Sequence, residues 1–146
     1  MPFWRQPTPP ATTSKPAPLI LVVDDDRDTR ELYRAFFDLS GFRTAEAATG
    51  REALAVLRRM RPDVLLTDLV LPDLDGLAIA GEVVRDASTA HTRIILLTGY
   101  GGPDLATRAA GAGVERTLQK PCLPSEMLRE VRRALGRGPA PRIGVA

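Results

Sequence analysis

Five side chains that could do chemistry together stand directly after short apolar runs of the chain. They are the carboxylates of Asp24, Asp25 and Asp68, the hydroxyl of Thr98 and the ammonium of Lys120. Clustered carboxylates repel one another, and Mg²⁺ is the usual cation that holds a few of them ionised beside phosphate oxygens. A carboxylate can also attack phosphorus, while metal, ammonium and hydroxyl groups stabilise the transferred charge. The set predicts Mg²⁺-dependent phosphoryl transfer to Asp68.

These side chains can meet only if the apolar runs before them are neighbouring strands. Residues 19–23, 64–67 and 94–97 are continuous apolar runs, typical of strands buried on both faces of a parallel sheet. Residues 42–46 and 115–119 are weaker strand candidates. In open α/β sheets, sites lie beyond the carboxyl ends of strands, which are spaced by about 4.8 Å. We therefore expect the five side chains to converge on one pocket.

Apolar residues recur at helical spacing in the segments between these strands. The predicted buried faces are Leu32, Phe36 and Leu39; Ala53, Leu57 and Met60; Ala80, Val83 and Val84; Leu105, Ala106, Ala109 and Ala110; and Leu128, Val131 and Leu135. Gly41 has the place of a helix C-cap, and Asp75-Gly76 that of a turn before the third helix. Five strands alternating with five helices predict an α/β fold with a doubly wound five-stranded parallel sheet.

Composition divides the 146-residue chain into a folded centre and two tails. Residues 1–18 contain six prolines and are predicted to be a disordered extension, and residues 136–146 a flexible tail. Residues 19–135 are predicted to form one domain, which holds 16 Lys and Arg against 18 Asp and Glu. The net charge of +2 therefore comes from the tails, and no basic stripe indicates direct binding of nucleic acid.

The cysteine count and the hydropathy pattern exclude several other classes. The single cysteine permits no intramolecular disulfide and no multi-cysteine metal cluster. No apolar run approaches the roughly 20 residues of a membrane helix, and the N-terminal segment lacks the apolar centre of a signal peptide. We expect a cytoplasmic protein that makes no membrane contact.

Several residues also have an ordinary structural interpretation. Residues 24–26 would cap the first helix, because acids favour helix N-termini. Cys122 is expected to be a small packing residue and His91 to lie on a surface loop. Tyr100, among three glycines, is either a partner contact or a lid over the site. The occurrence of the acids, Thr98 and Lys120 at successive strand ends favours the chemical interpretation.

Across nearly all of residues 19–135, the chain resembles the receiver domain of two-component response regulators. The matching motifs are Val22-Val23-Asp24-Asp25, the run from Thr67-Asp68 to Asp75-Gly76, Leu97-Thr98-Gly99, and Lys120-Pro121. The resemblance implies a flavodoxin-like fold with strand order 2-1-3-4-5, and a cis bond before Pro121. It also implies a phosphoprotein rather than an enzyme with a separate substrate, although such domains catalyse their own phosphorylation and dephosphorylation.

The resemblance implies a role for each residue that matches the site. These roles are phosphoacceptor for Asp68, metal ligand for Asp25, a second acid on the metal for Asp24, a metal-binding backbone carbonyl for Val70, and contacts to phosphoryl oxygens for Thr98 and Lys120. The implied donor is a sensor histidine kinase or a phosphotransfer protein. The implied output is altered protein binding by the last two helices and the strand between them, in a monomer or weak homodimer.

Two departures from the family pattern leave alternatives open. Thr117 stands where an aromatic ring usually couples phosphorylation to the binding surface, and Cys122 stands where Phe is frequent. A receiver-fold adaptor that works without phosphorylation is therefore an alternative function. A Mg²⁺-dependent phosphatase with an aspartyl nucleophile is a weaker one, because it needs an acid two residues after Asp68, where this chain has Val70.

Overall fold

The computed structural model describes residues 16–99 and 101–136. Of the predicted extension (residues 1–18), residues 1–15 lie outside these ranges, and residues 16–18 are described without helix or strand. Of the predicted tail (residues 136–146), residue 136 is described as the end of the last helix, and residues 137–146 lie outside. Strands and helices alternate along the chain as β1 (Leu19–Val23), α1 (Arg27–Leu39), β2 (Arg43–Ala47), α2 (Gly50–Met60), β3 (Val64–Asp68), α3 (Gly76–Arg85), β4 (Arg93–Thr98), α4 (Pro103–Gly111), β5 (Arg116–Gln119) and α5 (Pro124–Gly136). None of the helices in the described part of the chain has the length and apolarity to cross a bilayer.

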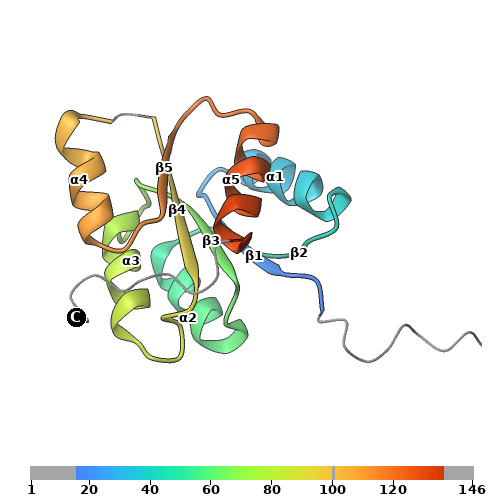
Figure 1. Cartoon of the computed structure of the whole chain (residues 1–146), viewed down its shortest axis with the longest axis horizontal. Helices are drawn as coiled ribbons and strands as arrows, with labels where there is room; N and C mark the ends of the chain where they lie inside the picture. The colour runs from blue at the N-terminus through green and yellow to red at the C-terminus, as the bar shows by residue number, and fades with distance from the viewer. Residues whose placement is uncertain (1–15, 100, 137–146) are drawn as a thin grey trace, which may run out of the picture.

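The five strands form one parallel sheet in the order β2-β1-β3-β4-β5, which confirms the expected topology. The central register aligns Leu21 of β1 with Leu65 of β3, and Leu65 with Ile94 of β4. Helices α1 and α5 cover one face of this sheet, and α2, α3 and α4 cover the other (Figure 1). The fold is therefore doubly wound, with all strands ending at one edge.

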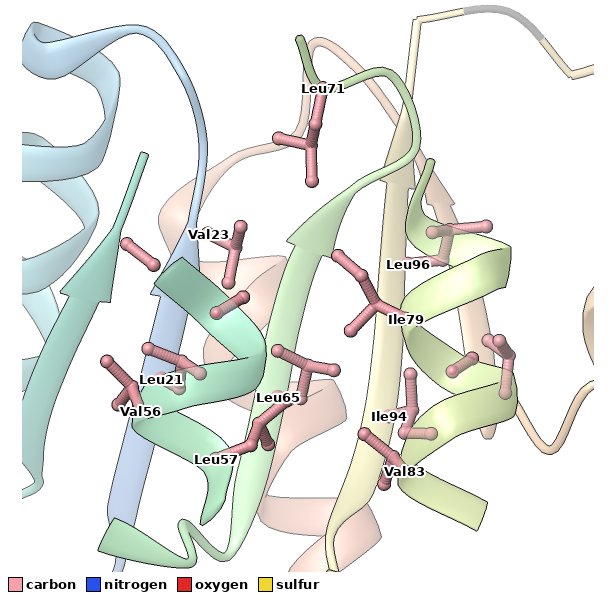
Figure 2. Packing of buried hydrophobic residues seen from close by; sticks show 14 of the residues in the cluster. Leu21, Val23, Val56, Leu57, Leu65, Leu71, Ile79, Val83, Ile94 and Leu96 are labelled. Carbon is pink, nitrogen blue, oxygen red and sulfur yellow. The ribbon is translucent and has the colours of Figure 1, made fainter. Parts of the chain in front are cut away.

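Two separate apolar cores hold the helices against the sheet, because alternate side chains of a strand point to opposite faces. On one face, Leu21, Leu65 and Ile94 pack against residues of α2 and α3 such as Leu57 and Ile79 (Figure 2). On the opposite face, a second cluster joins the sheet to α1 and α5. Its fully buried or nearly buried members include Ile20, Val22, Phe37, Leu66, Ile95, Met127 and Val131.

The predicted buried face of α1 is wrong in part. Leu39 is 90% exposed and Leu32 is also exposed, whereas Tyr33 and Phe37 are buried in the second core. Phe36, the third predicted residue, is partly buried at its edge. The observed pair and the predicted set both satisfy helical spacing, so periodicity alone did not decide which stripe faces the sheet. In α2, Ala53 and Leu57 are buried as predicted, but Met60 at the helix end is exposed.

Polar contacts of α1 agree with the face that it buries. The carboxylate of Asp26 accepts the Thr29 backbone N–H at 3.0 Å and caps the helix. Arg30 and Arg34, one turn apart, both pair with Glu46 of β2, so this stripe of α1 lies at the edge of the sheet. Tyr33 and Phe37 then face inward.

Glycine and aspartate positions mark the helix ends as expected from the sequence. Gly41 adopts a positive φ of 94° just after α1, a conformation that side chains rarely adopt. Asp75 caps α3 by accepting the Ala78 backbone N–H at 2.7 Å, and Gly76 is the first residue of that helix. Helix α4 begins at Pro103.

Candidate functional site

The acidic side chains predicted to converge meet at the carboxyl ends of β1 and β3. The structure places ligand oxygens of Asp24, Asp25 and Asp68 within 4.8 Å of one another. Asp24 is almost entirely buried at 2% exposure, while Asp25 is open to solvent. The cluster is thus formed by one buried acid, one exposed acid and the partly buried Asp68.

Lys120 bridges two of these carboxylates from the end of β5. Its Nζ lies 2.9 Å from Oδ2 of Asp24 and 3.2 Å from Oδ2 of Asp68. The two carboxylates come from strands that the sheet order places beside each other, and the lysine comes from the other side of β4. A cation therefore already sits between two acids whose charges would otherwise repel.

Burial and charge act in opposite directions on the groups of this cluster. Burial raises the pKa of Asp68 above its ordinary value, and the nearby Lys120 ammonium offsets only part of that rise. Burial would lower the pKa of Lys120, but hydrogen bonds and charges from Asp24 and Asp68 outweigh it, so the pKa is raised. Lys120 is therefore firmly cationic at neutral pH, and Asp68 is a poorly solvated carboxylate.

The acidic triplet after β1 divides between two roles. Asp26 caps α1, and hydrogen bonds from the Thr29 side chain and backbone lower the pKa of its carboxyl. Its own backbone N–H donates to Oδ1 of Asp24 at 2.9 Å and so orients that carboxylate. The capping interpretation thus holds for Asp26, whereas Asp24 and Asp25 belong to the cluster.

The loop after β3 is anchored on both sides of Val70. The Leu69 N–H donates to the Leu97 carbonyl at 2.8 Å, and the Gly76 N–H donates to the Leu69 carbonyl at 2.7 Å. The Val70 side chain is 71% exposed at the rim of the site. Gly76 packs so closely that a Cβ at this position would lie 2.7 Å from the carbonyl oxygen of Asp68.

Thr98 and Lys120 end adjacent strands on the far side of β3. Thr98 is buried at the end of β4 and directly follows Leu97, which pairs with Asp68 across the sheet. The Lys120 N–H donates to the Thr98 carbonyl at 2.7 Å. The peptide bond between Lys120 and Pro121 is cis, as expected. All five side chains singled out from the sequence therefore lie at one edge of the sheet.

Two residues that support the site were missed by the sequence analysis. Arg30 donates from Nη1 to the backbone carbonyl of Asp24 at 2.7 Å, and its Nε pairs with Glu46 at 2.6 Å. The signal available was weak: two arginines four residues apart in the first helix, and one acid in an expected strand. Nothing in their spacing shows that Arg30 turns back toward the end of β1.

The remaining residues discussed from the sequence lie apart from the acidic cluster. Cys122 is buried in the second core, with its Sγ 3.6 Å from Glu126, and burial with this acid raises its pKa to about 11. His91 is exposed between α3 and β4, and Thr117 is half-buried on β5. Tyr100 lies outside the described residues.

The oxygen-rich cluster fits a small hard cation. Three carboxylates within 4.8 Å provide the one or two acid ligands that Mg²⁺ requires, and the open side at Asp25 leaves room for water. No nitrogen or sulfur donor takes part in this cluster of the described chain, which makes it a poor match for zinc. The donor set thus agrees with the expected magnesium site.

Comparison with known proteins gives a consistent family assignment. Residues 20–132 match the family model described as the response regulator receiver domain. The chain is 36% identical over 112 residues to an uncharacterised 14.6 kDa protein of Leptolyngbya boryana, covering 77% of this chain and 86% of the relative. It is 32% identical over 118 residues to the phosphate regulon transcriptional regulatory protein PhoB of Pseudomonas aeruginosa, covering 81% of this chain and 52% of that protein.

Solved structures agree with this match. A CheY-like receiver domain protein of Methanospirillum hungatei superposes with a TM-score of 0.77 at 25% identity, covering 82% of this chain and 94% of the other. The chemotaxis response regulator CheY4 of Vibrio cholerae gives 0.76 at 28% identity, covering 81% and 98%. The chain spans about half the length of several regulators that it matches. With its fold, its acidic cluster and these matches, the chain belongs to the response regulator receiver domains of two-component signalling.

Proposed function

We propose that Asp68 accepts a phosphoryl group from the phosphohistidine of a sensor kinase or a phosphotransfer protein. The observation that carries this proposal is the bridge from Lys120 to both Asp68 and Asp24. A lysine in this place supports Asp68 as the reacting acid. Its ammonium pairs with the Asp68 carboxylate and could pair instead with an oxygen of the incoming phosphoryl group. Family membership supports the same role.

In the proposed reaction, one carboxylate oxygen of Asp68 attacks phosphorus. The new O–P bond forms while the P–N bond of the phosphohistidine breaks, and the leaving imidazole takes up a proton from water. Partial burial leaves the Asp68 carboxylate poorly solvated and therefore more basic, which favours attack. Lys120 would bind one phosphoryl oxygen and the Thr98 hydroxyl another.

Asp24, Asp25, Asp68 and the Val70 carbonyl would hold Mg²⁺ beside the reacting groups. When bound, the ion would neutralise charge on the phosphoryl oxygens. The mutual proximity of the three carboxylates supports this assignment. Because the cation and the phosphoryl oxygens carry opposite charges, we expect each to bind more tightly when the other is present.

A groove beside Lys120 offers the donor a place to approach. It has a volume of about 450 Å³ and is lined by Thr29, Leu32, Tyr33, Cys122 and Pro124, among others. The exposed Leu32 on its rim could pack against a donor helix. Cys122, which stands where related domains often carry Phe, is one of its lining residues.

The proposed output is a change in protein binding by the surface of α4, β5 and α5. Helix α4 buries only Leu105 and Ala109 among its described residues, so a small change in the loop before it can shift the helix. We propose a cytoplasmic protein that acts as a monomer or weak homodimer and signals through a protein target. We propose no direct contact with nucleic acid and none with a membrane.

Thr117 keeps one alternative open, namely an adaptor that uses the receiver fold without phosphorylation. The threonine is only half-buried on β5 and is too small to reproduce the burial of an aromatic ring. In that case the acidic cluster would remain from an ancestral function. Labelling by acetyl phosphate distinguishes the two functions.

Phosphorylation is tested by measuring intact mass after incubation with Mg²⁺ and acetyl phosphate. We expect one phosphoryl adduct on the native chain, none with Asp68→Asn, and an unchanged adduct with Asp104→Asn, which alters an exposed acid on α4. EDTA should abolish the adduct. Absence of any adduct, under conditions that label another receiver domain, would refute the proposal and favour the adaptor.

A further inference from the structure

Arg30 contacts the peptide group that links the two acids at the end of β1. Its Nη1 donates to the carbonyl oxygen of Asp24 at 2.7 Å, and this carbonyl belongs to the amide between Asp24 and Asp25. The side chain of Arg30 is only 12% exposed, and its Nε is held by Glu46 at 2.6 Å. The guanidinium is thus fixed by β2 while it binds the backbone of the acidic segment.

The other polar groups of Asp24 are also engaged, each by a different element. Its N–H donates to the Ala47 carbonyl of β2 at 3.2 Å. Its two carboxylate oxygens accept from the Asp26 N–H at 2.9 Å and from Lys120 at 2.9 Å. The remaining polar group of Asp24 is its backbone carbonyl, and Arg30 donates the hydrogen bond to it. The direction of this carbonyl sets the orientation of the peptide group that leads to Asp25.

We propose that Arg30, held by Glu46, is a positioning residue for the metal pair Asp24 and Asp25. By fixing the plane of the amide between them, it sets the direction of the exposed Asp25 relative to the buried Asp24. Groups that orient metal ligands without touching the metal typically change affinity by about 10- to 100-fold when removed. This inference rests on the proposed magnesium site and adds a residue that the resemblance to receiver domains did not indicate.

The sign of the effect separates positioning from simple electrostatics. A nearby arginine repels a divalent cation, so its loss should tighten Mg²⁺ binding if charge alone mattered. Loss of positioning should instead weaken binding. Arg34 provides the matched control, because it pairs with the same Glu46 from one turn further along α1 and donates to Thr44, a residue of β2 away from the acids.

The test is a Mg²⁺ titration of the whole chain, followed by the backbone amide NMR shifts of residues 24–26 and 68. We expect the Mg²⁺ Kd to rise about tenfold in Arg30→Ala and to stay within twofold, or fall, in Arg34→Ala. Arg30→Lys should lie between native and Arg30→Ala, because one ammonium cannot bond the carbonyl and Glu46 in the same fork geometry. Thermal unfolding in EDTA shows whether both alanine variants lose comparable stability.

A rise of less than threefold in Arg30→Ala would overturn the inference, as would an equal rise in both alanine variants. If Arg30→Ala does not fold, Arg30→Lys and Glu46→Gln carry the test, and native-like Mg²⁺ affinity in both would overturn it. A native chain that binds no Mg²⁺ would instead overturn the proposed metal site, and the positioning role with it. Normal binding by the native chain and by the Arg30 variants would reject only the positioning role.

Discussion

Replacing Gly76 by alanine would place a methyl group against the backbone of the acidic site. A Cβ built at this position lies 2.7 Å from the carbonyl oxygen of Asp68, 2.7 Å from Cδ1 of Leu96 and 3.2 Å from Cα of Leu69. Two of these three atoms belong to the backbone of β3 and its loop, so rotation of a side chain cannot relieve them. Either α3 or the end of β3 has to move.

The size of the effect follows from two opposing contributions. Overpacking a well-filled site lowers the free energy of unfolding by about 1–3 kcal/mol. Exchanging glycine for alanine within a helix raises it by up to about 1 kcal/mol. Gly76 is the first residue of α3, so the stabilising contribution of alanine is small there. We expect the free energy of unfolding to fall by about 1–2 kcal/mol in Gly76→Ala. Gly81→Ala in the same helix is the matched control. Its Cβ meets only the flexible end of Arg85 at 3.4 Å, and it should stabilise by about 0.5–1 kcal/mol.

Urea unfolding of the native chain and the two variants measures this difference. With a slope of about 2 kcal/mol per molar urea, the midpoint should fall by about 0.5–1 M in Gly76→Ala and rise by about 0.25–0.5 M in Gly81→Ala. Labelling by acetyl phosphate should slow in Gly76→Ala only, because the displaced atom belongs to Asp68. A Gly76→Ala midpoint equal to or above that of Gly81→Ala would refute the packing argument.

Two further predictions concern the lysine bridge and the cysteine. Lys120→Met should cost about 2–3 kcal/mol in EDTA, because it leaves Asp24 and Asp68 without their shared cation, and Mg²⁺ should restore more stability to the variant than to the native chain. Equal melting temperatures in EDTA would contradict this. With a pKa of about 11, Cys122 should be about 0.1% thiolate at pH 8, against about 10% for a thiol with the reference pKa of 9.0, so iodoacetamide should react about 100-fold more slowly than with such a thiol. A rate that levels off near pH 9 would show that burial and Glu126 do not control this thiol.

The centre of the sheet could be predicted from the sequence because β1, β3 and β4 are apolar over nearly their whole length, whereas β2 and β5 carry polar residues. Runs such as residues 94–97 have no polar face, and this pattern fits a strand covered on both sides. All strands of a parallel sheet end at the same edge, so the residues that follow them were expected to lie close together without knowledge of individual tertiary contacts. The convergence of Asp68, Thr98 and Lys120 follows from this geometry.

The rotation of α1 and the support of the site could not be predicted in the same way. Leu32 and Tyr33 lie on adjacent stripes that both satisfy helical spacing, and the choice between them depends on which stripe packs best against residues of other elements. The bond from Arg30 to the Asp24 carbonyl joins a side chain to a backbone atom. Periodicity and motif matching consider side chains alone, and therefore neither detects such a bond.

The sheet divides the interior into two cores, and this division affects how the sequence can evolve. Neighbouring residues such as Val22 and Val23 belong to different cores, so substitutions on the two sides share few contacts and their energies should add. Residues of α1 and α5 can therefore be substituted during evolution without a compensating substitution in the core that α4 covers. The strand ends between them, which carry the acids and the lysine, are the part that both sides constrain.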